Sequence, residues 1–559
     1  MVTPKLLLGP VLRHTDATSA AVWVETDAPC RVEVAGASAD TFTVHGHHYA
    51  LVEVVGLTPG GCVPYTVRLD GHPVWPLPGS PLPASRIRTP RPDAPARLAF
   101  GSCRTSTGYQ GDGLEEYGPD ALRGYANRLL AVGDESWPDL LLLLGDQAYA
   151  DEPPRRLKPL LRSRRERRRA RRPAPSDEVA DYTEYARLYR TAWRDPLVRW
   201  LLSTVPTSMI FDDHEVRDDW NISADWQRYI RSRSWWPERI SAALGSYWVY
   251  QHLGNLSPAE RAADPVLAAV TGAGSGPGGD AGKELDTLVS GFDADPAGYR
   301  WSYARQLGPM RLVVLDCRAA RVLTPGRRRL LDPAEWRWFE DQANGPANAA
   351  DHLVIGSSLP YLLPKAVHHL ERWNEAVCDG SWGRWAGRLA ERIRQELDLE
   401  HWAAFRHSFD AMERTVRAVA AAERAPASVL FLSGDVHYSY LARVRRRSLR
   451  AATTVYQLVC SPLRNPMGRS LRWLTVVSVL RLAGWVGWLL EKVDGAPGTR
   501  LDWRINRGPW FENSIAELRA DQRRCEVRWF AARAVGGDGG LESAPVSEWL
   551  EPLHAERLA

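Results

Sequence analysis

Three carboxylates and one imidazole occupy four consecutive positions in the chain. Asp212, Asp213, His214 and Glu215 directly follow an apolar run that ends at residue 211. Carboxylates held this close at the rim of a buried segment repel one another strongly unless a cation compensates them. The spacing therefore indicates a site that binds a cation.

A second group of oxygen donors follows the five consecutive leucines at 140–144. Gly145 ends that run, and Asp146, Tyr149 and Asp151 come directly after it. Gly-Asp pairs are also common in turns, so Asp146 alone would carry little weight. The spacing of three between Asp146 and Tyr149 lets both oxygens reach one ion if the chain turns there.

Two further apolar runs end in residues that bind metals. Asp435 and His437 follow FLSG, and a spacing of two places both side chains on one face of an extended chain. They form either a structural pair or a pair of ligands. Cys103 follows ARLAFGS, where a lone cysteine is more often a small buried hydrophobe. Tyr109 stands where a tyrosine-phosphatase nucleophile would need its phosphate-binding arginine, so Cys103 does not fit that role.

The donor types narrow the choice of metal. The candidates are rich in carboxylate oxygen and poor in histidine, with one phenol and one thiol. Zinc usually draws on His and Cys, oxygen-rich sites suit Ca²⁺, Mg²⁺ or Mn²⁺, and phenolate with thiolate suits Fe³⁺. A mixed site is expected, in which two ions about 3.5–4 Å apart would bridge a hydroxide and grip a phosphoryl oxygen.

The elements that must position these residues are buried strands. The apolar runs alternate with amphipathic stretches such as 335–344 and 410–424, a pattern typical of an α/β sheet covered by helices on both faces. In such sheets ligands bind beyond the carboxyl ends of the strands. Because the polar endings recur after several runs, the sequence predicts one shared site at that edge.

Residues 1–92 have a different pattern. Short alternating runs such as 19–26 and 49–57 are broken by Asp, Gly and Pro, which predicts a small antiparallel β-sandwich. A proline-rich linker at 77–95 follows, and a length of 559 residues favours two domains. We expect an accessory domain at 1–92 and a catalytic domain at 93–559.

Composition sets weaker bounds. Lys and Arg exceed Asp and Glu by 71 − 67 = 4, a mild excess that does not demand a nucleic-acid partner. Seven cysteines without a CxxC pair, and no readable export signal, favour a reduced, cytoplasmic protein. The stretch at 473–490 is the one membrane candidate. Arg481 and two glycines interrupt it, so a buried helix or a peripheral contact is expected rather than a span.

Five segments in this order resemble the motifs of the alkaline phosphatase D (PhoD-like) family of calcineurin-like metallophosphoesterases. They are GSCR at 101–104, GDQAYAD at 145–151, FDDHEVRDDW at 211–220, LDCRAAR at 315–321 and SGDVHYSY at 433–440. The resemblance covers residues 93–465. It implies an α/β fold of layered sheets flanked by helices, with the N-terminal β-sandwich as an accessory domain.

The resemblance also implies a set of metal ligands. Fe³⁺ would be bound by Cys103, Asp146, Tyr149 and His437. Ca²⁺, with Mn²⁺ or Mg²⁺ as substitutes, would be bound by Asp146, Asp213 and Asp435, so that Asp146 bridges the ions. Asp212 is implied either as a further ligand or as a residue that orients one.

Three more residues receive implied roles in catalysis. His214 would contact the phosphate or protonate the leaving group, and Arg104 would clamp the phosphate through its planar fork of donors. Arg318 is a second candidate for the clamp, with an ion pair to Asp316 as the structural alternative.

The expected activity is metal-dependent hydrolysis of phosphate esters by a metal-bound hydroxide, with monoesters and diesters both open. The alternative is a metal-stabilised binding or scaffold protein that has lost catalysis. An Arg-rich insertion at 155–172 is expected to be a solvated, mobile loop. Its functional alternative is an electrostatic funnel for a polyanionic substrate or nucleic acid.

Overall fold

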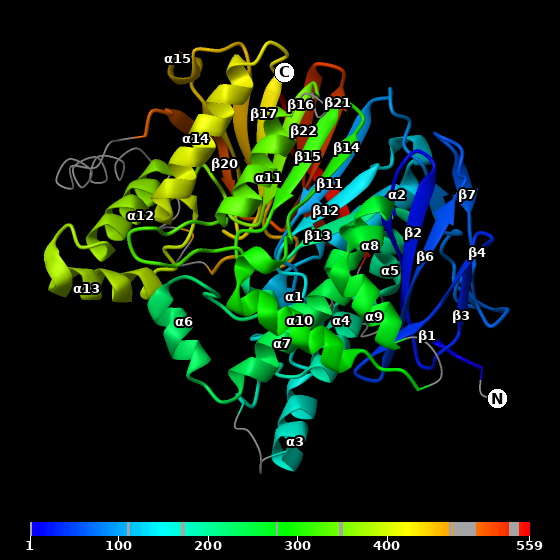
Figure 1. The fold of residues 1–559 in the computed structure, drawn as a ribbon. Coiled ribbons are helices and arrows are strands. Elements are labelled where there is room, and N and C mark those ends of the chain that lie inside the picture. Colours follow the sequence, from blue (N-terminus) through cyan, green and yellow to red (C-terminus); the bar gives the residue numbers. More distant parts are fainter. Residues whose placement is uncertain are drawn as a thin grey trace.

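The computed structural model describes residues 3–108, 112–168, 174–274, 278–345, 350–468, 472, 499–535 and 547–559 (Figure 1). The stretch at 473–490 lies outside these residues, as does the end of the Arg-rich insertion at 169–172. None of the described helices combines the length and the apolarity needed to cross a bilayer.

The N-terminal region is built from antiparallel sheets, as predicted. One sheet has the order β1-β2-β6-β5 and another the order β4-β3-β8-β9, with a β10-β7 ribbon beside them. The alternating residues of 49–57 explain the facing of β6, because Val52 and Val54 are buried while Glu53 and Val55 are exposed. The strands are β1 (Leu6–Thr15), β2 (Ser19–Thr26), β3 (Arg31–Val34), β4 (Ala37–Asp40), β5 (Phe42–Val44), β6 (His47–Val55), β7 (Cys62–Pro64), β8 (Val67–Leu69), β9 (His72–Trp75) and β10 (Arg86–Arg88). The domain boundary at residue 92 stays a prediction.

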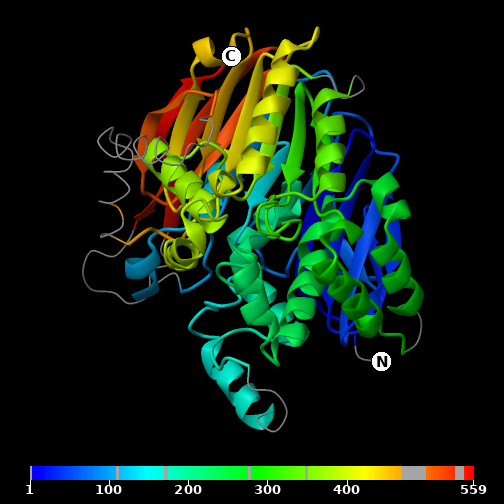
Figure 2. The same cartoon turned by 60° about the vertical axis from the view of Figure 1, so that its left-hand side comes forward.

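Two larger sheets make up the rest of the described core (Figure 2). The first has the order β13-β12-β11-β21-β22-β23, and β11, β12 and β13 run parallel. Its strands are β11 (Ala96–Gly101), β12 (Leu140–Leu144), β13 (Thr207–Ile210), β21 (Ser514–Asp521), β22 (Arg524–Val535) and β23 (Ser547–Arg557).

The second sheet has the order β14-β15-β16-β17-β19-β18-β20. Its central strands β15, β16, β17 and β19 are parallel. The strands are β14 (Tyr303–Leu307), β15 (Met310–Leu315), β16 (His352–Ser357), β17 (Ser428–Ser433), β18 (Ser439–Val444), β19 (Thr454–Val459) and β20 (Trp503–Trp510).

The leucine run of β12 is buried on both faces because it separates two cores. Leu140, Leu142 and Leu144 belong to the core that the two sheets share. Leu141 and Leu143 belong instead to the core beneath the helices that cover the first sheet. An apolar run without alternation is what a strand between two packed layers requires.

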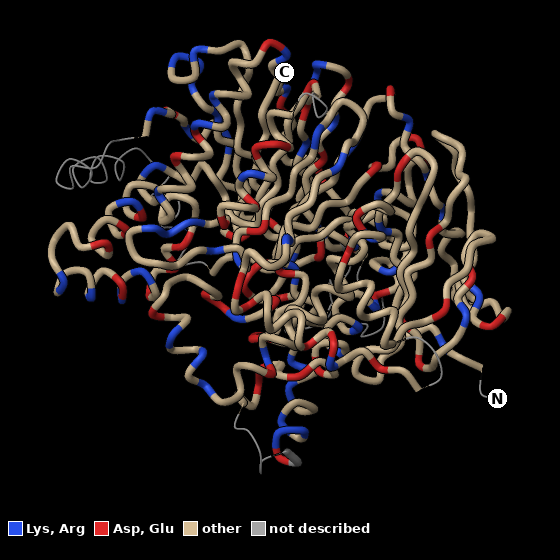
Figure 3. Tube along the Cα trace, in the orientation of Figure 1, with Lys and Arg blue, Asp and Glu red and all other residues tan. Residues whose placement is uncertain are grey.

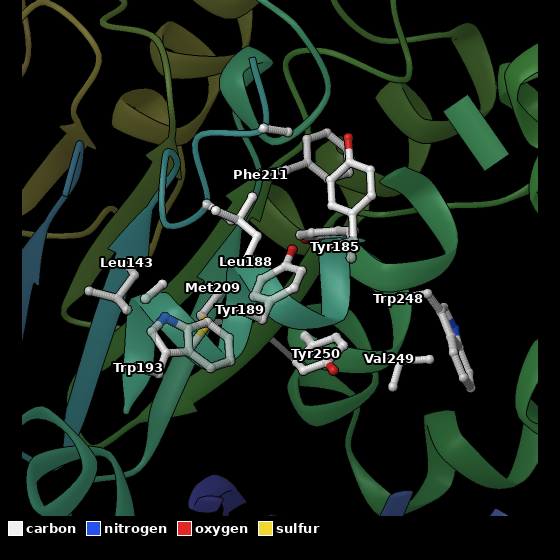
Figure 4. Packing of buried hydrophobic residues seen from close by; sticks show 14 of the residues in the cluster. Leu143, Tyr185, Leu188, Tyr189, Trp193, Met209, Phe211, Trp248, Val249 and Tyr250 are labelled. Atoms are coloured by element: carbon white, nitrogen blue, oxygen red, sulfur yellow. The ribbon is translucent and has the colours of Figure 1, made fainter. Parts of the chain in front are cut away.

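Helices cover the outer face of each sheet. The first is covered by α2 (Ala121–Ala131), α4 (Tyr182–Trp193), α5 (Pro196–Thr204) and α7 (Trp236–Tyr247), and the second by α11 (Pro333–Asn344) and α14 (Arg406–Ala421). Beside them, α12 (Lys365–Cys378) meets β20 through the rings of His368 and Trp503. Under α4, Tyr189 stacks on Tyr250 with ring centroids 4.3 Å apart, beside Trp193 and Met209 (Figure 4). The predicted α/β fold of layered sheets flanked by helices is confirmed. The remaining helices are α1 (Asp112–Tyr117), α3 (Lys158–Arg168), α6 (Ala224–Arg231), α8 (Pro258–Ala263), α9 (Pro265–Gly274), α10 (Gly282–Ala294), α13 (Gly383–Glu396) and α15 (Arg446–Leu449).

The Arg-rich insertion corrects one expectation. Its described part forms the helix α3, not a loop, and this helix projects from the body of the molecule (Figures 1 and 2). Leu161 on its inner side is buried. Arg164 and Arg165 both pair with Glu184, at 3.1 and 2.7 Å. Glu184 thus holds the helix in place and neutralises part of its positive charge. An electrostatic funnel for a polyanionic substrate would depend on that charge.

Candidate functional site

The carboxyl ends of strands from both sheets bring the predicted ligands together. Cys103 follows β11, Asp146 follows β12, Asp213 follows β13, and Asp435 with His437 follows β17. β11, β12 and β13 run parallel to one another and β17 runs parallel to β16, so their carboxyl ends lie at one edge of each sheet. Residues more than 330 positions apart in the chain therefore share one site.

The backbone at these strand ends is in a conformation that most side chains avoid. Cys103, Asp146, Asp435 and His437 have φ values of 56°, 56°, 65° and 55°. Left-handed backbone at a residue other than glycine costs about 1–3 kcal/mol and clusters at functional sites. Four such residues in one site indicate that the fold sacrifices local stability to aim these side chains.

Gly145 shows how tightly the turn after β12 is packed. Its φ is +99°, and a Cβ added there would lie 2.6 Å from the Cβ of Asp212. The backbone N–H of Cys103 donates to the carbonyl of Gly145 at 3.2 Å, and that of Arg104 donates to the carbonyl of Asp146 at 3.0 Å. Only glycine meets both the conformation and the close approach.

Within the described part of the chain, the donor atoms form three overlapping groups, and inside each group the candidate ligand atoms lie within 4.8 Å of one another. The groups are Cys103, Asp146 and His437; Asp146, Asp213 and His214; and Asp212, Asp213 and Asp435. Asp146 links the first group to the second. Among the residues that the structure describes, two buried oxygens, Asp146 Oδ1 and Asp212 Oδ2, have no hydrogen-bond partner. Buried carboxylate oxygens without a donor are costly unless a cation binds them, so the residues fit a metal site.

Tyr149 and Cys103 are protonated unless a cation lies beside them. Burial, followed by the charge of Asp146, raises the pKa of the Tyr149 phenol and of the Cys103 thiol well above their ordinary values. The Tyr149 hydroxyl donates to Asp146 Oδ2 at 3.3 Å and accepts from Asn465 Nδ2 at 3.0 Å. The phenol is therefore already oriented towards the shared carboxylate.

His214 is held by Asp151. Its Nδ1 lies 3.0 Å from both oxygens of the Asp151 carboxylate, and its ring packs on Tyr149 with centroids 4.7 Å apart. Burial alone would lower the pKa of His214, but the charges of Asp151 and Asp146 outweigh it and raise this pKa well above its usual value. The arrangement suits a protonated imidazole that contacts Asp151 through Nδ1 and not through Nε2.

The Glu215 carboxylate holds two strand ends together through hydrogen bonds from backbone N–H groups. Its Oε2 accepts the backbone N–H of Asp146 at 2.9 Å and of Asp212 at 2.8 Å. Its Oε1 accepts the N–H of Gln147 at 2.5 Å and of Ala148 at 3.2 Å. The sequence placed Glu215 in the acidic cluster, but only the structure shows this anchoring role.

Arg104 is not where a phosphate clamp is needed. Its guanidinium is buried and donates to Asp120, with Nε–Oδ2 at 3.0 Å and Nη2–Oδ2 at 2.8 Å, and its Nη1 donates to the carbonyl of Ala192. Asp120 also caps the start of α2 through the N–H of Leu122. These contacts assign Arg104 a structural ion pair, which corrects the clamp predicted for it.

Arg318 lies among the site carboxylates instead. Its guanidinium donates to Asp212 and Glu400, and its Nη2 is 3.3 Å from Asp213 Oδ1 and 3.6 Å from Asp435 Oδ1. The expected partner Asp316 instead accepts the backbone N–H of Arg318 at 2.7 Å. Arg318 therefore supplies positive charge among the site carboxylates, a role that the sequence predicted first for Arg104.

Two residues of the site carried no readable signal in the sequence. His401 Nε2 lies 3.0 Å from Asp435 Oδ2, and His401 Nδ1 lies 2.7 Å from Glu371 Oε1. Glu371 is buried on α12, and His401 follows α13. The pair fixes one oxygen of Asp435 and leaves Oδ1 directed at the other site groups. Neither residue follows an apolar strand, so the pattern that found the ligands could not find them.

Comparisons with known proteins identify the family of this chain. A family model described as PhoD-like phosphatase matches residues 120–472, and a domain of unknown function (DUF7800) matches residues 3–87. No curated protein matches the chain.

Two solved structures are similar to this one. The structure of PhoD aligns with a TM-score of 0.56 at 12% identity, over 99% of this chain and 93% of that chain, which shows a shared fold. The purple acid phosphatase PPD1 from yellow lupin (Lupinus luteus) seeds aligns with a TM-score of 0.44 at 9% identity, over 95% of this chain and 72% of that chain. Because the family model spans more than half of the residues, the chain belongs to the PhoD-like phosphatase family.

Proposed function

We propose that this protein hydrolyses phosphate esters, monoesters or diesters, in a reaction that depends on bound metal ions. The observation that carries the proposal is the chain of three overlapping donor groups joined through Asp146 and Asp213. Membership of a phosphatase family supports the reaction class. The unpartnered Asp146 Oδ1 supports the metal dependence.

The donor chemistry divides the site into two halves. Cys103, Asp146, Tyr149 and His437 offer a thiol, a carboxylate, a phenol and an imidazole, a set that suits Fe³⁺. Asp146, Asp213 and Asp435 offer oxygen alone, which suits Ca²⁺, with Mn²⁺ or Mg²⁺ as substitutes. When bound, such ions lower the pKa of a water molecule and neutralise charge on phosphoryl oxygens.

The remaining residues position groups and move a proton. Asp212 Oδ1 accepts from Arg318 and from Ser358 Oγ, so we assign this oxygen to orientation of its neighbours and leave Oδ2, which has no partner among the described residues, as a further donor to a cation. Asp151 orients His214 through Nδ1, which leaves Nε2 to donate a proton to the departing alkoxide. Arg318 offsets the negative charge of the carboxylates around it.

Metal analysis with a visible absorption spectrum tests the metal assignment. Ferric phenolate or thiolate gives a coloured protein, and chelation should remove both colour and activity. Nitrophenyl phosphate and bis(nitrophenyl) phosphate, with Ca²⁺ added, test the two ester classes. A protein that binds metal but hydrolyses neither ester would support the scaffold alternative. A colourless protein that contains only zinc would contradict the ligand set.

A further inference from the structure

Helix α13 carries an apolar surface that nothing in the described structure covers. Trp382, Trp385, Leu389 and Leu397 on and beside it are 46%, 77%, 46% and 57% exposed. Trp385 has the highest exposed fraction among the large apolar side chains that the structure describes. A single exposed apolar residue is ordinary, but four within sixteen positions form a patch.

The opposite side of α13 packs against α12, so the exposed residues belong to a helix that is held in place. Ala390 and Arg394 are buried, and the carbonyl of Ala390 accepts from Asn374 Nδ2 on α12 at 2.8 Å. Trp382 meets Trp373 of α12 with ring centroids 5.4 Å apart. The helix is thus fixed to α12 along one side and presents the other to solvent.

Three arginines of α13 lie beside the apolar patch. Arg384, Arg388 and Arg392 are exposed and recur every fourth residue, which places them along one face of the helix next to Trp385 and Leu389. Among the residues that the structure describes, no acidic side chain pairs with any of the three, whereas the buried Arg394 pairs with Glu391 at 2.9 Å. Figure 3, in the orientation of Figure 1, shows basic and acidic positions along α13 at the edge of the molecule.

We propose that α13 is a docking surface for an anionic lipid bilayer. A helix with tryptophan and leucine on one stripe and unpaired arginines beside it lies in the plane of a membrane interface. The indole ring of Trp385 is amphipathic and suits the headgroup level, while the long arginine side chains reach lipid phosphates. The three arginines, which pair with no acidic side chain in the described part of the chain, supply the charge complementarity that favours an anionic bilayer over a neutral partner.

Along the chain, α13 lies only a few residues from residues of the candidate site. The segment after α13 leads from Glu396 to Glu400 and His401, which contact Arg318 and Asp435. Five residues span at most about 18 Å when fully extended. The inference does not depend on the proposed hydrolysis, because it rests on the exposed face alone.

Flotation of the full-length protein with vesicles tests the inference. We expect binding to vesicles that contain phosphatidylglycerol, weaker binding to phosphatidylcholine alone, and loss of binding at high salt. The pair Trp385→Ser and Leu389→Ser should lower the partition coefficient at least about tenfold. The triple change of Arg384, Arg388 and Arg392 to Gln should lower it about a hundredfold on anionic vesicles only.

Matched controls separate docking from general surface effects. Val55→Ser removes a side chain that is 69% exposed in the N-terminal region, and Arg91→Gln removes an exposed charge there. Neither should alter flotation, and all variants should keep the circular dichroism spectrum of the parent. A parent protein that does not float would overturn the proposal. The proposal would also be overturned if the α13 variants floated like the parent, because binding would then lie elsewhere in the chain. Self-association of the parent through α13 in sedimentation without lipid would overturn it as well.

Discussion

Replacement of Glu215 by Gln tests how the site is held together. The Glu215 carboxylate accepts four backbone N–H groups, from Asp146, Gln147, Ala148 and Asp212. A glutamine of the same shape has one carbonyl oxygen and one amino group. In either orientation, its amino group therefore faces two backbone N–H donors that then lack an acceptor, and at the Oε1 position it also faces Gln251 Nε2.

The size of the effect follows from these contacts. A buried donor left without a partner costs about 1–3 kcal/mol, so two cost about 2–6 kcal/mol. Removal of one charge from the acidic cluster offsets part of this, because Glu215 adds to the raised pKa of Asp146. We expect a net loss of about 2–4 kcal/mol in the local free energy of opening of the turns at 145–148 and 211–213.

Peptide-resolved hydrogen exchange measures this opening. A loss of about 2–4 kcal/mol corresponds to about 30- to 1,000-fold faster exchange of the amides in the two turns. Metal content should fall in the same variant. Glu517→Gln is the matched control, since Glu517 accepts only the Tyr125 hydroxyl among its described hydrogen bonds, and a glutamine carbonyl can replace it. Unchanged exchange and metal content in Glu215→Gln would refute the anchoring role.

Three further single substitutions, one of them extended to a double variant, test separate parts of the site. Asp146→Asn should remove metal and nearly all hydrolysis because it neutralises the shared ligand, and a variant that keeps metals and full rate would contradict the proposed centre. His214→Ala should retain metals while kcat falls about 10²–10⁴-fold, as expected for a lost proton donor; metal loss instead would assign it to binding. His401→Phe should weaken Ca²⁺ binding about 10–100-fold, measured by calorimetry, because Asp435 loses its orienting partner. Addition of Glu371→Gln to His401→Phe should restore stability because it removes a buried charge that has lost its partner. An unchanged Ca²⁺ affinity in His401→Phe would show that His401 and Glu371 do not position Asp435.

The sequence by itself determined the layered fold and the donor types that gather at one edge of the sheets. Five leucines without alternation require burial on both faces, and β12 does lie between two cores. The rule that ligands bind beyond the carboxyl ends of strands placed Cys103, Asp146, Asp213 and His437 at one edge, and the structure brings them together. These predictions succeeded because burial and strand direction are encoded locally.

The tertiary structure alone decided which charges meet. The sequence offered Arg104 and Arg318 as clamps, and nothing in the neighbouring residues distinguished them. Arg104 is bound by Asp120 outside the cluster, while Arg318 reaches Asp212, 106 positions away in the chain. Partner choice for a long cationic side chain depends on which carboxylate the fold places within reach, and that distance is set by the packing of two sheets rather than by any local pattern.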